Sequence, residues 1–163
     1  MTDAAWQIIR RYSSKGVLID TNILLLYFIG AFNRERIERF KRTKQFTARD
    51  YDLLIGFINQ FRVVATTPNI LTEVNSLINQ LGEPDRSNCY LLFASEVEFF
   101  QETYLRSQEV VSTDWSFQRY GLTDCGTAKL ASNRYLVLTD DLKLTRYLNS
   151  LGVDTLNFNN LKD

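Results

Sequence analysis

Acidic side chains in this sequence fall at the ends of short apolar runs, where a carboxylate stays close to a buried edge. Asp20 ends the run "GVLID", Asp140 and Asp141 follow "YLVLT", and Asp124 lies in "GLTDCGTAKLASN". Carboxylates a few Å apart repel one another, raise one another's pKa and lower stability unless a cation or a shared proton relieves them. If these acids converge in the fold, the simplest relief is a hard divalent cation, Mg²⁺ or Mn²⁺, held by oxygen ligands.

Glu73 belongs to the same set because of its place on a predicted helix. It lies in the first turns of "PNILTEVNSLINQL", which follows another short apolar run. On a helical wheel it is next to Ile70 and Leu77, at the margin of the apolar face. A carboxylate at that margin can point along the packed face into a cleft.

Each acid also has a simpler interpretation when it is taken alone. Asp20, Asp124 and Asp140 could each cap a helix, where a side-chain oxygen accepts from a free backbone N–H and contributes about 1 kcal/mol. Glu73 could be a solvated residue on the flank of its helix. The metal hypothesis therefore rests on the convergence of four acids and not on any one of them.

Composition removes several classes of chemistry. The chain has no histidine, which excludes Ser-His and Cys-His hydrolases, histidine general bases and histidine-ligated zinc. The 19 basic and 19 acidic residues balance, so the chain lacks the global positive charge of a typical nucleic-acid-binding domain. Cys89 and Cys125 lie on separate predicted helices without a CxxC pair, and we expect small buried side chains there and not a zinc site or a disulfide.

The elements that must position the acids alternate along the chain. Predicted strands cover residues 16–20, 62–66, 135–139 and 153–158, and predicted helices cover 3–14, 21–32, 33–41, 47–61, 68–81, 87–105, 121–133 and 140–151. This alternation predicts an α/β fold, a three-layer α/β/α sandwich with a central parallel sheet, in a single domain over residues 1–163. Ligands of such sheets bind beyond the carboxyl ends of the strands, so acids after different strands are expected at one edge.

No segment has the character of a membrane span or a secretory signal. The longest apolar stretch, Ile23 to Ile29, is far shorter than the roughly 20 residues that a span needs. The N-terminus places its basic residues after the apolar ones and has no small-residue cleavage signature. We expect a soluble, cytoplasmic protein that does not contact a membrane.

Four motifs taken together, "LIDTN", "LTEVNSL", "GLTDCGTAKLA" and "LVLTDD", resemble the PIN-domain family of metal-dependent ribonucleases. The resemblance runs from about Val17 to Phe158 with the motifs in the family's order. It implies a PIN-like fold and a site that binds Mg²⁺ or Mn²⁺. Carried over residue by residue, the metal-site and catalytic residues are Asp20, Glu73, Asp124 and Asp141, with Asn22 and Thr139 as polar neighbours.

The sequence also departs from the family pattern. Asp140 stands beside Asp141 where the family has one acid, and either could face the metal. We favour Asp141 because its spacing from Thr139 fits, and we keep Asp140 as a metal candidate. The long stretch between Asp20 and Glu73, and the helix before the first strand, differ from the compact toxin members of the family.

The resemblance implies hydrolysis of RNA phosphodiester bonds by water activated on one or two bound metal ions, which leaves 5′-phosphate and 3′-hydroxyl ends. Asp20 and Asp124 would ligate metal directly, and Glu73 and Asp141 would complete the site or hold its waters. By family frequency we expect a toxin of a toxin–antitoxin pair, with an antitoxin protein and a second copy of the chain as possible partners. An RNA-processing enzyme is the nearest rival.

A basic segment is the expected contact for the RNA backbone, because an acidic pocket repels a polyanion. The segment from residue 34 to residue 49 interleaves Phe40 and Phe46 with cationic side chains. Its alternative is a solvated helix face supported by Glu35 and Arg39. The residues that we expect to bind RNA are Arg34, Arg36, Arg39, Lys41, Arg42 and Lys44.

Two other functions compete with the ribonuclease hypothesis. A PIN-fold module could bind RNA or a protein without catalysis, although the complete set of acids argues against this. An aspartate-based phosphotransferase could use a similar sheet. Against it, "DTN" lacks the second aspartate of the D-x-D phosphatase pattern, and no lysine follows the third predicted strand within its loop.

Overall fold

The fold is a parallel β-sheet between two helical layers. The computed structural model describes residues 3–111 and 115–162. In the described residues the sheet has five strands in the order β3-β2-β1-β4-β5, all of them parallel. They are β1 (Val17–Ile19), β2 (Val64–Thr66), β3 (Gln101–Glu102), β4 (Leu136–Thr139) and β5 (Thr155–Asn157). The predicted α/β/α sandwich with a central parallel sheet is confirmed.

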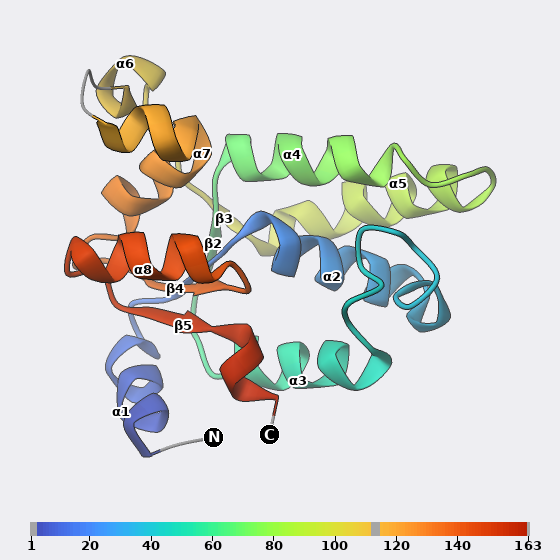
Figure 1. The fold of residues 1–163 in the computed structure, drawn as a ribbon. Coiled ribbons are helices and arrows are strands. Elements are labelled where there is room, and N and C mark those ends of the chain that lie inside the picture. The colour runs from blue at the N-terminus through green and yellow to red at the C-terminus, as the bar shows by residue number, and fades with distance from the viewer. Residues whose placement is uncertain (1–2, 112–114, 163) are drawn as a thin grey trace.

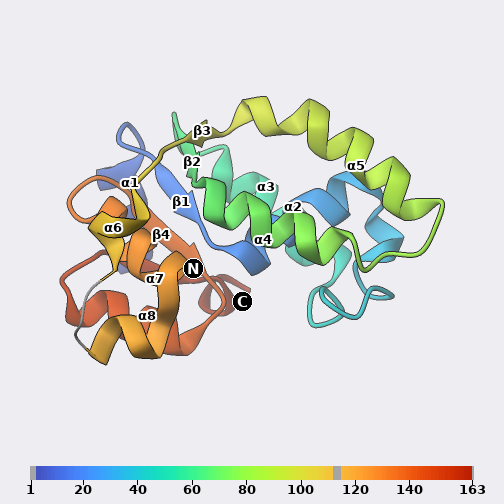
Figure 2. The ribbon, with the colours of Figure 1, turned by 90° about the horizontal axis from the view of Figure 1, so that it is seen from above.

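The helices lie on both sides of this sheet. In Figure 1, α1 and α3 lie below the level of the sheet, and α4, α5 and α7 lie above it. Figure 2 shows β3, β2, β1 and β4 next to one another across the sheet. The α-helices are α1 (Asp3–Tyr12), α2 (Thr21–Phe32), α3 (Ala48–Ile58), α4 (Pro68–Ile78), α5 (Asp85–Glu96), α6 (Ser107–Val110), α7 (Trp115–Ala131) and α8 (Leu142–Ser150).

Local sequence signals explain where several helices begin. Thr47 and Asp50 form a capping box at the start of α3, with the Thr47 N–H donating to the Asp50 carboxylate at 2.8 Å. Pro68 is the first residue of α4, where its missing N–H costs nothing, and the Thr67 hydroxyl accepts from Ile70 N–H. The helices predicted for residues 47–61 and 68–81 therefore begin where they were expected.

The core is centred on β1 and α2. All three residues of β1 are fully buried, as a central parallel strand covered on both faces requires. Helix α2 is apolar almost all round and is buried along most of its length, which explains why its sequence has no polar face. Cys89 and Cys125 are free and buried, as expected. No helix in residues 3–111 or 115–162 has the length and apolar character to cross a bilayer.

The prediction for residues 33–41 was wrong. This stretch contains only one turn of 3₁₀ helix, η1 (Arg34–Arg36), followed by further turns. Ile37 and Phe40 are buried there, and the Thr43 hydroxyl donates to the Ile37 carbonyl at 2.8 Å. In these turns the apolar side chains of Ile37 and Phe40 reach the core without a regular helix.

The helix predicted for residues 87–105 was also too long. Helix α5 ends at Glu96 and is followed by a 3₁₀ turn, η2 (Val97–Phe99), and then by β3, a fifth strand that was not predicted. Phe100 is buried against the Tyr27 and Phe28 rings, with centroids 5.3 and 5.8 Å away. A two-residue edge strand is too short to show a periodic pattern, and here tertiary packing decides the local structure.

Two glycines provide a test of packing on the helices. A Cβ at Gly30, on α2, would overlap the Tyr51 ring, whereas a Cβ at Gly56, on α3, would meet nothing within 4 Å. We expect Gly30→Ala to lower the free energy of unfolding by about 1–3 kcal/mol through overpacking. Gly56→Ala should raise it by about 0.5–1 kcal/mol through helix propensity. Urea unfolding of both variants checks this, and equal effects would contradict the packing described for α2.

Candidate functional site

Asp20 is fixed at the junction of the two central strands. Its backbone N–H donates to the Leu138 carbonyl of β4 at 3.0 Å, and its side chain caps α2 by accepting from Thr21 N–H at 2.7 Å. The second carboxylate oxygen accepts from the Thr139 hydroxyl at 2.6 Å. The residue is only 8% exposed. Strand order reverses between β1 and β4, so Asp20 lies at the topological switch point where such sheets bind ligands.

Glu73 reaches the same place from α4. Its carboxylate accepts from the Thr21 hydroxyl of α2 at 2.7 Å and from the Thr123 hydroxyl of α7. Glu73 therefore joins three helices through hydrogen bonds to two hydroxyl groups. The side chain as a whole is exposed, so it lies at the rim of the site and not in its interior.

A break in α7 places Asp124. Gly121 has φ 76°, in the left-handed region that favours glycine, and it separates the helix into two segments with different directions. Thr123 and Asp124 then fall in the first turn of the second segment. The prediction that a helix begins near residue 121 was therefore right, and the preceding segment from Trp115 was missed.

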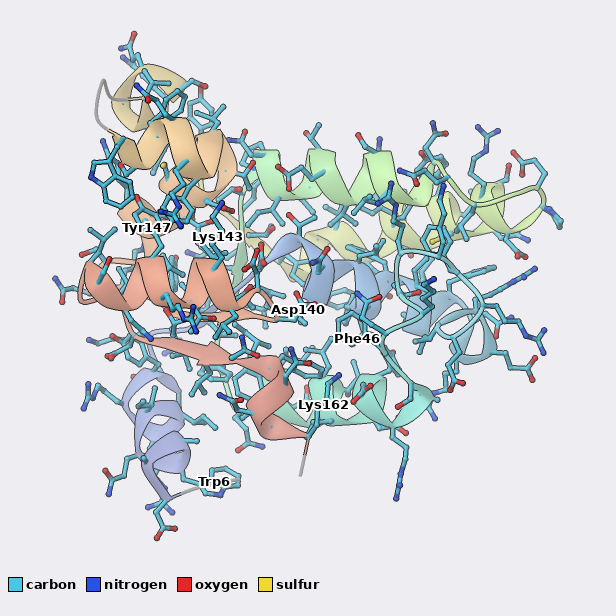
Figure 3. The ribbon with its side chains drawn as sticks, in the orientation of Figure 1. Trp6, Phe46, Asp140, Lys143, Tyr147 and Lys162 are labelled. Atoms are coloured by element: carbon cyan, nitrogen blue, oxygen red, sulfur yellow. The ribbon has the colours of Figure 1, made fainter. Side chains whose placement is uncertain are left out.

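Asp140 and Asp141, next to each other in the sequence, have different partners. Asp141 caps α8, accepting from Lys143 N–H at 2.6 Å and from Leu144 N–H at 3.1 Å, and its own N–H donates to the Thr139 hydroxyl. Asp140 accepts from the Asn22 amide at 3.2 Å. In Figure 3, Asp140 lies between the start of α8 and α2. The helix-capping interpretation thus holds for Asp20 and for Asp141 rather than for Asp140.

These side chains line one cleft of about 440 Å³ at the carboxyl edge of the sheet. Asp20, Glu73, Asp124 and Asp141 all lie on its wall, as does Asn22. The Thr139 hydroxyl donates to Asp20, and Asp140 is connected to the cleft wall because it accepts from the Asn22 amide. The sequence did not indicate the other members of the wall, which are Thr21, Thr72, Ser76, Leu77 and Leu144.

Burial and the charges of neighbouring acids raise the pKa of Asp20, Asp124 and Asp140. Burial, with the neighbouring charges of Asp140 and Glu73, raises the pKa of Asp20 to about 6 although two hydrogen bonds oppose the shift. Burial, with the charges of Asp20, Glu73 and Asp141, raises the pKa of Asp124 to about 7. Burial also raises the pKa of Asp140. The neighbouring carboxylates therefore disfavour one another's ionisation, as expected for acids that converge.

The donor set suits Mg²⁺ or Mn²⁺, because every charged group on the cleft wall is a carboxylate. However, no group of three or more His, Cys, Asp and Glu side chains in the described parts of the chain is arranged to hold a metal ion. Glu73 accepts from the Thr21 and Thr123 hydroxyls, and Asp141 accepts from the backbone of α8.

The predicted basic segment lies away from the cleft. Arg34 pairs with Asp52, Arg36 pairs with Asp85, and the Arg42 guanidinium donates to Gln80 at 2.8 Å. The segment follows the far end of α2, whose 12 residues span about 18 Å. Arg39, Lys41 and Lys44 remain exposed.

The two aromatic residues interleaved with the cations of that segment belong to the core. Phe40 and Phe46 are buried, at 6% and 1% exposure, and Phe46 packs against Phe158 of the 3₁₀ turn η3 (Phe158–Leu161). They serve the core and present no ring to a nucleobase. The spacing of aromatic and basic residues in the sequence could not distinguish these two uses.

The raised pKa of Asp124 predicts a pH-dependent stability in the absence of metal. Because the fold favours the protonated acid, its destabilising effect appears as the pH rises from about 4 through about 7. Asp124→Asn should stabilise the protein at pH 8 by on the order of 1–3 kcal/mol and much less at pH 4, after allowance for partial exposure. Denaturant unfolding with chelator at both pH values checks this.

The control for that measurement is Asp52→Asn. Asp52 is an exposed acid on α3 and pairs with Arg34, far from the other carboxylates. Its substitution should not stabilise the protein at pH 8. A gain for Asp124→Asn that is equal at pH 4 and pH 8 would show that charge repulsion is not its cause.

Comparison of the chain with protein-family models, with curated proteins and with solved structures found no match. The likeness to PIN-domain ribonucleases therefore rests on the four sequence motifs and on the positions of their residues. Those positions are at one sheet edge, and the functional argument has to be made from the cleft itself.

Proposed function

We propose that the protein is a metal-dependent ribonuclease of the PIN type, an endonuclease that uses Mg²⁺ or Mn²⁺ at the carboxylate cleft. The observation that carries the proposal is that four carboxylates from four separate elements line one cleft at the topological switch point. The sequence places them far apart, from residue 20 to residue 141, and only the fold assembles them. Capping accounts for Asp20 and Asp141 but not for Glu73, which lies inside α4 and is directed to the same cleft.

Each carboxylate of the cleft has its own role in the proposed site. Asp20 is held by Thr139 and by the N-terminus of α2, so it provides a fixed oxygen ligand at the base of the cleft. Asp124 and Glu73 face it from α7 and α4, and Asp141 closes the site from α8. A bound Mg²⁺ or Mn²⁺ would offset phosphate charge and lower the pKa of a water molecule, which removes the need for a histidine base. Asn22 positions Asp140 at the margin of the site.

The exposed cations of the basic segment supply a second contact for the RNA in this proposal. Within residues 3–111 and 115–162, Arg39, Lys41 and Lys44 form no ion pair of the kind that engages Arg34 and Arg36. They follow the far end of α2, a helix about 18 Å long that begins at the cleft, so they suit a substrate several nucleotides long. This contact would add affinity without reading sequence.

A second candidate is a non-catalytic module that binds RNA through the same surfaces. The observation that favours it is the engagement of Glu73 and Asp141 with hydroxyl and amide donors, which leaves no preformed metal-binding group in residues 3–111 and 115–162. The two candidates differ in metal binding and in product formation, so one pair of experiments separates them.

The first experiment compares cleavage of single-stranded and hairpin RNAs by the native protein with Mg²⁺, Mn²⁺ or chelator. We expect metal-dependent fragments with 5′-phosphate ends, and a loss of at least about 100-fold in rate for Asp20→Asn and Asp124→Asn because each removes a metal ligand. Asp52→Asn, an acid-to-amide change outside the cleft, should cleave like the native protein. Titration calorimetry with Mn²⁺ should show binding that both cleft variants lose.

The second candidate gains support if neither cleavage nor Mn²⁺ binding is detected while RNA still binds. Cleavage that survives in Asp20→Asn and Asp124→Asn would remove the carboxylate cleft as the catalytic site.

The basic segment is tested by replacing Arg39, Lys41 and Lys44 together with glutamate. RNA affinity should fall, and the dependence of log K on log salt should become shallower by about 2 to 3, because up to three phosphate contacts are lost. Filter binding at a series of salt concentrations measures both quantities. A variant that binds with native affinity and native salt dependence would show that this segment is only a solvated surface.

A further inference from the structure

A cluster of aromatic side chains lies beside the carboxylate cleft, on α7 and α8. The Tyr120 ring stacks on the Tyr147 ring, with 3.9 Å between centroids and 13° between planes. Trp115 lies on the same side of α7, with its ring 6.3 Å from that of Tyr120. Trp115 is 62% exposed, an unusual position for a large indole ring. Tyr120 is half-buried and Tyr147 is buried, so the two stacked tyrosines support the indole ring and Trp115 offers the accessible surface. We call Trp115, Tyr120 and Tyr147 the aromatic platform.

Two cations border this platform. Lys143 Nζ lies 5.0 Å from the centroid of the Tyr120 ring, and the Arg119 guanidinium lies 5.7 Å from it. Lys143 also donates to the Arg119 carbonyl at 3.3 Å, which links α8 to the first segment of α7. Figure 3 shows Lys143 and Tyr147 on α8 where it faces α7. Both cations are exposed and retain charge that a phosphate can use.

The platform is continuous with the cleft. The Lys143 N–H donates to the Asp141 carboxylate at 2.6 Å, and Lys143 ends in the ammonium group next to Tyr120. On the other element, Tyr120 directly precedes the Gly121 break, and Asp124 follows in the next turn. The ammonium group of Lys143 is also close enough to Asp124 to act on its carboxyl group electrostatically. Lys143 therefore stands between the acids and the aromatic rings.

We infer that the exposed indole ring of the aromatic platform stacks an unpaired nucleobase of single-stranded RNA while Lys143 and Arg119 contact the adjoining phosphates. The inference rests on the proposed function and names its substrate class. An exposed ring next to cations is a feature that binds single strands without sequence preference, because every base has a π-face. A duplex conceals those faces, so the platform favours unpaired RNA.

Charge supports this occupant over a protein segment. The cleft wall is acidic, and a polyanion can approach it only where cations lie at the border. Arg119 and Lys143 lie at that border, next to the exposed indole ring. An apolar protein segment would use the indole ring but would leave both cations without partners.

The fluorescence of Trp115 can be used to measure RNA binding. The chain has two tryptophans, so Trp6→Phe leaves Trp115 as the single fluorophore. In that variant, with chelator to prevent metal-assisted cleavage, a single-stranded oligouridine of about 12 nucleotides should quench the fluorescence. An RNA duplex of equal length should quench it far less.

Affinity measurements on three further variants complete the test. Trp115→Ala should weaken single-strand binding about 10-fold, whereas Trp115→Phe, which keeps a ring, should retain most of it. Lys143→Gln should reduce the salt dependence of binding by about 1. Trp6→Phe, the change of the other tryptophan, should bind like the native protein, and circular dichroism should show an unchanged fold for all four variants.

Three results would overturn the inference. They are equal quenching by duplex and single strand, native affinity of Trp115→Ala for the oligouridine, and a Trp115→Ala variant that changes oligomeric state in size-exclusion chromatography while binding RNA normally. The last result would assign Trp115 to a protein contact. The result of the cleavage assay with Mn²⁺ is independent of the quenching result, because quenching is measured in chelator and does not require the metal site.

Discussion

The hydrogen bond from the Thr139 hydroxyl to the Asp20 carboxylate is the constraint on which the rest of the site depends. It joins β4 to the end of β1 at the point where strand order reverses, and it allows a carboxylate to be buried there. From Asp20 the contacts continue through Thr21 to Glu73, and from Glu73 to Thr123. Threonine hydroxyls thus connect the sheet to α2, α4 and α7, and the acids keep their places without a metal ion.

The crowding of these acids lowers the stability of the fold. Acids crowded at one edge raise the pKa of Asp20 and of Asp124 by burial and by mutual repulsion. Each would be more stable as an amide at neutral pH, so the retention of carboxylates suggests a role other than stability. The apolar surroundings help to hold the charged groups close together, because β1 and α2 are buried in a closely packed core.

The sequence predicted the sheet and most of the site because their signals are local. Short apolar runs, capping residues and Pro68 define the central strands and the helices that follow them. Prediction from the sequence failed where tertiary packing overrides the local pattern. Phe40 and Phe100 are buried in segments that are not regular helices, so one predicted helix is replaced by turns and another ends early, before β3. The hydroxyl partners of the acids also had no signal, because a threonine on a helix looks the same whether it faces a carboxylate or water.

Gly121, the residue with positive φ in α7, affects how the sequence of this helix can change in evolution. In an uninterrupted helix, residues 120 and 124 would lie one above the other on a single face, and any shift in one would rotate the other. The break at Gly121 removes that coupling. The segment before it and the segment after it can accept substitutions or altered length independently. Evolution could therefore change the aromatic segment before the break while the carboxylate geometry after it stays as it is.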